Sequence, residues 1–154
     1  MTRVPEFDLQ AAHRHFAAHC FNAAWDLMEK LDRTPEEDRA MVASSYASLY
    51  HWLQRSDGTP QQLSVGYWQL ARIAALLGHA DEARRHGEAC RTYADGLAPF
   101  FQGYAHEALA RAARVAGDGS TADAQLALAR RHAAQVEDAA ERALLERDLA
   151  DLER

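Results

Sequence analysis

Two stretches of the chain, 39 residues apart, repeat the same order of small, large and turn-forming residues. The segment ARIAALLGHADEARRH begins at Ala71, and ARAARVAGDGSTADAQ begins at Ala110. Each has a glycine at the same offset, Gly78 or Gly117, in a position typical of a helix end. We infer that each stretch contains the end of one helix, a turn and the start of a second helix. The chain is therefore expected to be a series of helix pairs.

The composition and the helix-start signals both favour an all-α fold. Alanine is abundant, β-branched residues are few, and no alternating run of strand length occurs. Thr34 and Thr59 each precede a proline and stand three residues before a Glu or Gln, the pattern of a capping box. Ser120 and Asp138 are weaker starts of the same kind. These signals predict seven helices, at residues 8–31, 35–55, 60–77, 80–95, 99–116, 121–136 and 139–152.

The length of 154 residues predicts one domain, 1–154. The repeat units are expected at about 8–55, 60–95 and 98–136, followed by a capping helix at 138–153. That last helix has an apolar stripe of Leu145, Leu149 and Leu152. Its acidic residues are expected to face water; they are Glu141, Glu146, Asp148, Asp151 and Glu153.

The repeated residues resemble the tetratricopeptide repeat. Three segments align, and they begin at Trp25, Trp68 and Glu107. In each, the first residue is large, a leucine follows two positions later, and a small or flexible residue comes next. The match is best over 65–134. The spacings of 43 and 39 residues are longer than the roughly 34 of that family. The resemblance implies a right-handed α-α superhelix with antiparallel helix pairs and no enzymatic activity. The whole chain is also similar to a group of small bacterial repeat-like proteins.

In this family the first helix of each pair lines a concave face that binds a protein or peptide. The resemblance therefore implies that this face binds such a partner or a second copy of the chain. Carried over by position, the face here would include Trp68, Arg72, Tyr104, Glu107, Arg111 and Arg114. The guanidinium group is a donor fork suited to carboxylates, so the implied partner is an acidic or C-terminal peptide segment. The alternative is that Glu107 and Arg111, four residues apart, form a surface ion pair of about 0.2–0.5 kcal/mol.

The aromatic run SYASLYHW lies within the second predicted helix. There Tyr46, Tyr50 and Leu53 share one face, and Ser45, Leu49 and Trp52 share another. Either both faces pack in the core, or an exposed aromatic face forms a homodimer.

The segment HRHFAAHC, from His13 to Cys20, raises the question of a metal site. Helical spacing turns His13 and Cys20 toward the core and sets His15 and His19 side by side on the flank. A third ligand would have to come from another helix, with His51 and His106 as candidates. The alternative function is therefore a metal-dependent helical-bundle enzyme, and a third is a small-molecule sensor with an aromatic pocket near Trp52 and Trp68.

Other classes of function find little support. The formal net charge of −6 and the single lysine, Lys30, argue against a nucleic-acid partner. The start MTRVPEFDLQ lacks the apolar run of a signal peptide, and no stretch approaches the ~20 apolar residues of a membrane span, so we expect a cytoplasmic protein with no membrane partner. Cys20 and Cys90 are predicted to be buried thiols. No phosphate-binding loop or nucleophile elbow occurs, and we expect no cofactor.

Overall fold

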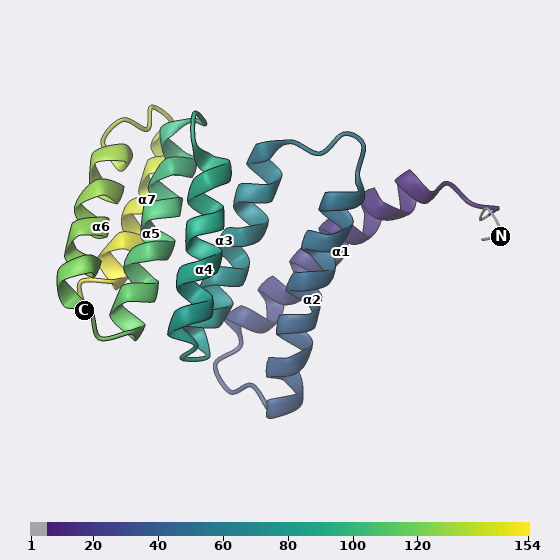
Figure 1. Cartoon of the computed structure of the whole chain (residues 1–154), viewed down its shortest axis with the longest axis horizontal. Coiled ribbons are helices and arrows are strands. Elements are labelled where there is room, and N and C mark those ends of the chain that lie inside the picture. The colour runs from purple at the N-terminus through teal and green to yellow at the C-terminus, as the bar shows by residue number, and fades with distance from the viewer. Residues whose placement is uncertain (1–5) are drawn as a thin grey trace. The chain divides into compact units, whose positions relative to one another are not determined.

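The computed structural model describes residues 6–154, which form seven α-helices and no strand (Figure 1). The helices are α1 (Leu9–Glu29), α2 (Pro35–Gln54), α3 (Pro60–Leu76), α4 (Ala80–Ala94), α5 (Pro99–Val115), α6 (Gly119–Ala133) and α7 (Ala139–Asp151). The all-α fold is confirmed. The first half of MTRVPEFDLQ lies outside the described residues. Within 6–154, no helix has the length and apolar character needed to cross a membrane.

Local capping explains where most of the helices begin. Thr34 Oγ1 accepts from the Glu37 amide at 3.2 Å, and the Glu37 carboxylate accepts from the Thr34 amide at 2.9 Å, which completes the capping box. The start predicted for α6 is wrong. Asp118, rather than Ser120, caps this helix by accepting from the Thr121 amide at 3.0 Å. Because the turn at Gly117 ends immediately before it, Asp118 is the first residue placed to cap the new helix.

The glycines of the repeat close α3 and α5 in the same way. Gly78 has φ +80°, and the amides of Gly78 and His79 donate to carbonyls of the last turn of α3 at 3.0 and 2.8 Å. Gly117 has φ +75°, and the amides of Gly117 and Asp118 repeat the two bonds at the end of α5. This is the Schellman arrangement, which requires a left-handed residue that glycine supplies without strain. The aligned glycines of the two stretches thus have the same backbone conformation.

The chain divides into two compact units, one extending to Leu63 and the other covering Ser64–Arg154. In the N-terminal unit α1 packs against α2 through Ala17, Ala24, Met41 and Leu49, all buried. The buried Ser48 hydroxyl donates to the Ala17 carbonyl at 2.7 Å. The small side chains at this seam let the two backbones approach closely.

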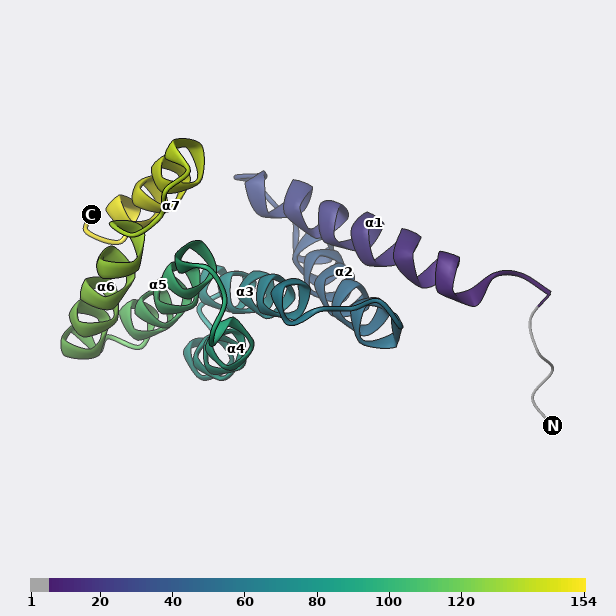
Figure 2. The same ribbon diagram turned by 90° about the horizontal axis from the view of Figure 1, so that it is seen from above.

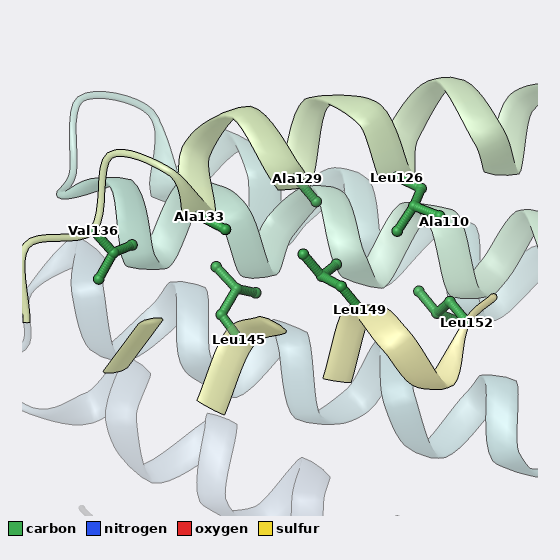
Figure 3. Close-up of a cluster of buried hydrophobic side chains, with 8 residues drawn as sticks. All are labelled: Ala110, Leu126, Ala129, Ala133, Val136, Leu145, Leu149 and Leu152. Carbon is green, nitrogen blue, oxygen red and sulfur yellow. The ribbon is translucent and has the colours of Figure 1, made fainter. Parts of the chain in front are cut away.

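In the C-terminal unit, α3, α5 and α7 form an inner layer, and α4 and α6 lie outside it (Figure 2). A cluster of buried side chains joins α5, α6 and α7 (Figure 3); it consists of Ala110, Leu126, Ala129, Ala133, Val136, Leu145, Leu149 and Leu152. Leu145 also reaches α5, where a Cβ placed on Gly103 would lie 2.5 Å from its Cδ2 atom. The leucine stripe of α7 therefore covers the end of this core, as its sequence predicts.

Candidate functional site

Polar and aromatic side chains from three helices meet on the inner layer of the C-terminal unit. We call this group the inner-face cluster; it consists of Trp68 and Arg72 on α3, Tyr104, Glu107 and Arg111 on α5, and Asp148 on α7. The first five were predicted from the sequence to share a face. The structure brings them together within one unit.

Glu107 is the centre of the inner-face cluster and is 0% exposed. Its Oε2 atom accepts from Trp68 Nε1 at 2.9 Å, and its Oε1 atom accepts from Arg111 Nε at 2.7 Å. Arg111 Nη2 lies 2.6 Å from the same Oε1. The Glu107–Arg111 pair was weighed as a surface ion pair, but it is largely buried: Glu107 is fully buried and the Arg111 side chain is 19% exposed. The Trp68 ring on α3, which bonds to Glu107, packs edge to face on the Tyr104 ring of α5. A buried carboxylate is tolerated only with this kind of charge and hydrogen-bond compensation.

Asp148 is the residue of the cluster that the sequence interpretation missed. It was expected to face water, but it is buried and accepts a hydrogen bond from the Tyr104 hydroxyl at 2.8 Å. Arg72 Nη1 lies 3.6 Å from Asp148 Oδ2 and 3.7 Å from Glu107 Oε1, so one guanidinium bridges both carboxylates. Burial, and then the hydrogen bond to Asp148, raises the pKa of the Tyr104 phenol. A signal was present, because Asp148 stands three residues after Leu145 and therefore on the buried stripe.

The two arginines of the inner-face cluster are partly exposed to solvent. Their side chains are 24% exposed for Arg72 and 19% exposed for Arg111. Arg72 Nη1 and Arg111 Nη2 are buried atoms without an aligned hydrogen bond. One helical turn after each arginine stands an exposed aliphatic residue, Leu76 at 49% and Val115 at 38%. On two adjacent helices of the inner face, a partly exposed arginine side chain is thus followed one turn later by an exposed apolar side chain.

Arg114 was also predicted on this face, but its contacts lie elsewhere. Its Nη2 atom donates to Asp123 on α6 at 2.9 Å, and its Nε atom donates to the Leu152 carbonyl at 3.3 Å. Near the end of α5, its long side chain reaches the C-terminal residues.

The histidines of the N-terminal unit pair differently from the prediction. His15 and His19 are exposed and stack with their ring centroids 5.6 Å apart. His51, a candidate to join them, instead places its Nδ1 atom 2.9 Å from Nδ1 of the buried His13. The other candidate, His106, contacts Gln125 and His132 in the C-terminal unit. Among residues 6–154, no group of three or more His, Cys, Asp or Glu side chains is arranged to hold a metal ion.

The remaining candidates are distributed over both units. Tyr46, Tyr50 and Leu53 are exposed, so their face is not part of the core seen here, whereas Leu49 is buried. The two tryptophans of the predicted sensor pocket belong to different units: Trp52 to the N-terminal unit and Trp68 to the C-terminal unit. Arg55 lies over the Trp52 ring.

The two cysteines have different surroundings. Cys90 is buried beside Ser64, and burial raises the pKa of its thiol to about 12. Cys20 is only half-buried, so the prediction of a buried thiol is right for Cys90 alone.

A groove of about 250 Å³ lies on the other side of the C-terminal unit, between α4, α5 and α6. Its floor is apolar, with Leu109 and Ala112, and its rim carries both charge signs, including Arg84 and Glu88. Because Arg84 and Glu88 already form an ion pair at 2.9 Å, this rim favours no single ligand charge.

We expect His132 to make the stability of the C-terminal unit sensitive to acid. Burial, and then the neighbouring His106, lowers the pKa of His132 below its ordinary value of 6.5. The unfolded chain therefore binds more protons between that lowered pKa and 6.5, so stability falls as the pH drops through this window. We expect the free energy of unfolding, measured with urea and circular dichroism, to decrease between pH 7 and pH 5. His132→Gln should flatten that decrease; an unchanged slope would contradict the assignment.

Comparison with known proteins finds no match: no family model, no curated protein and no solved structure matches the chain.

Proposed function

We propose that the chain is a tetratricopeptide-like helical repeat protein that binds an acidic peptide segment of a partner protein through the inner face of its C-terminal unit. The observation that carries the proposal is the repeated pairing of a partly exposed arginine with an exposed aliphatic residue, Arg72 with Leu76 and Arg111 with Val115. The guanidinium groups can donate hydrogen bonds to carboxylates of the ligand, and the aliphatic side chains can bury apolar parts of the same ligand.

Two structural features support the repeat character. Equivalent glycines close α3 and α5 with the same two backbone bonds, and α3, α5 and α7 share one layer (Figure 2). In a right-handed stack of helix pairs, that layer is the concave side, where extended segments bind.

The buried carboxylates set the strength and specificity of this site. Glu107 and Asp148 hold Arg72 and Arg111 in place, so little side-chain entropy is lost when a ligand binds. The two carboxylates also balance the charges of the two arginines, so binding of a short acidic segment would depend on the exposed guanidinium donors and not on a net positive charge.

Arg72→Gln is expected to weaken peptide binding. The probe is a displayed library of random peptides selected on the immobilised full chain, and we expect enrichment of Asp and Glu next to apolar residues. Loss of one charge-assisted contact, about 1.5–3 kcal/mol, corresponds to roughly 10- to 100-fold weaker binding of the enriched peptides. Glutamine is chosen because a Glu at position 72 would add a third carboxylate beside Glu107 and Asp148.

Two companion variants sharpen the test. Leu76→Asp removes the exposed apolar contact without touching the inner-face cluster, and it should also reduce binding. Arg84→Gln, on α4 at the rim of the opposite groove, should bind peptide as well as the parent chain does. Circular dichroism checks that each variant keeps its helicity. Enrichment without acidic residues, or equal binding by Arg72→Gln and Arg84→Gln, would refute the proposed face.

A further inference from the structure

The seam between α1 and α2 holds two imidazoles that face one another. His13 lies on α1 and His51 near the end of α2, and their Nδ1 atoms are 2.9 Å apart. His13 is 8% exposed, and one turn away Gln10 donates to the Gln54 carbonyl and so ties the same ends of the two helices. The packing of the two helices therefore fixes the positions of both rings, whereas a histidine on the open surface could rotate freely.

The distance between the nitrogens fits two kinds of bonding. In the metal-free protein, one ring donates its Nδ1 proton to the other. Alternatively, two nitrogens bound to one metal at about 2.0–2.1 Å and at right angles are separated by about 2.8–3.0 Å, whereas a tetrahedral angle needs about 3.3 Å. The observed 2.9 Å therefore matches neighbouring positions of a square-planar or octahedral ion.

We propose that His13 and His51 form a binding site for a divalent transition-metal ion of square-planar or octahedral preference, with Cu²⁺ as the best fit. Imidazole nitrogen suits this ion, and Cu²⁺ stands highest in the general order of affinities. Binding requires that the donor ring move its proton from Nδ1 to Nε2 and that the two rings turn until both Nδ1 lone pairs point at one ion; both rings stay neutral.

The surroundings of the pair leave part of the coordination sphere open. Phe16 and Tyr50 contact the rings of His51 and His13 from the flanks, and both aromatic side chains are exposed. No third ligating side chain joins the pair among the described residues. Water completes the coordination sphere, so the site binds the ion without enclosing it. This site is independent of the peptide face in the C-terminal unit.

The exposed pair on the same helix supplies a matched control. His15 and His19 stack with their rings 17° from parallel on the surface of α1 and depend on no partner helix. The double variant His15→Gln/His19→Gln removes two histidines from the same helix but leaves the His13–His51 contact intact. His51→Gln removes one of the two proposed ligands.

The test uses Cu²⁺ as the probe, on untagged full-length protein. Isothermal titration calorimetry should give one strong site per chain, and electron paramagnetic resonance should show two nitrogen ligands. We expect the same affinity and spectrum for His15→Gln/His19→Gln. Binding by His51→Gln should be roughly a hundredfold weaker, because a two-point attachment becomes a one-point attachment.

Two results would overturn the proposed site. Loss of the strong site in His15→Gln/His19→Gln, with retention in His51→Gln, would assign the metal to the exposed pair and overturn the proposal. A spectrum of the parent chain with a single nitrogen ligand would do the same, and this measurement does not depend on whether His51→Gln folds.

Discussion

Glu107→Gln is expected to destabilise the protein by about 3–5 kcal/mol, the cost of breaking a buried ion pair from one side. The substitution preserves shape but leaves Arg111 and Arg72 without the carboxylate that sits between them. It also weakens the acceptor for the Trp68 indole. Urea unfolding followed by circular dichroism gives the free energy directly.

The chain contains a matched control for this experiment. Arg84 and Glu88 on α4 also stand four residues apart and are joined at 2.9 Å, but both side chains are more than half exposed. Glu88→Gln should therefore cost no more than about 0.5 kcal/mol. Equal losses for the two variants would mean that burial does not govern the contribution of Glu107.

Leu145→Ala is expected to cost about 2–5 kcal/mol, because this fully buried side chain fills the space between α5, α6 and α7 (Figure 3). Gly103→Ala in the parent chain should also destabilise. The new methyl group meets Leu145 Cδ2 at 2.5 Å, and overpacking of this kind costs about 1–3 kcal/mol.

The double variant distinguishes steric conflict from loss of core. Once Leu145 is shortened, the methyl group at position 103 has room, and alanine is a better helix former than glycine by about 1 kcal/mol. Gly103→Ala should therefore stabilise the Leu145→Ala protein although it destabilises the parent. Additive losses in the urea-unfolding free energies would show that the two residues do not compete for the same space.

The helices could be predicted closely because their boundaries depend on local chemistry. Thr34, Gly78 and Gly117 act through hydrogen bonds to residues a few positions away, and such bonds can be inferred from the sequence. The exception, Ser120, shows the limit of this inference. Ser120 is of a residue type that caps helices, but the turn at Gly117 ends earlier in the chain and leaves Asp118 in the capping position.

The contacts between helices were predicted less completely, because they depend on rotation and register. The resemblance to the tetratricopeptide repeat implied that Trp68, Arg72, Tyr104, Glu107 and Arg111 share one face. It did not reveal that α7 would bring Asp148 to Tyr104, nor that His51 would meet His13 instead of His15 and His19. Tyr104 and Asp148 are 44 residues apart in the sequence, and His13 and His51 are 38 apart. Over such separations the sequence alone does not determine the distance between two side chains.

The hydrogen bond between Trp68 and Glu107 joins residues that occupy the same position in successive repeats. The two positions carry different residues, so one supplies a donor and the other an acceptor. The bond therefore gives the array a polarity: the α3–α4 pair supplies the donor, and the α5–α6 pair supplies the acceptor together with its arginine. Exchanging the order of the two helix pairs along the chain would preserve every turn and every cap. It would no longer place the Trp68 donor beside the Glu107 acceptor.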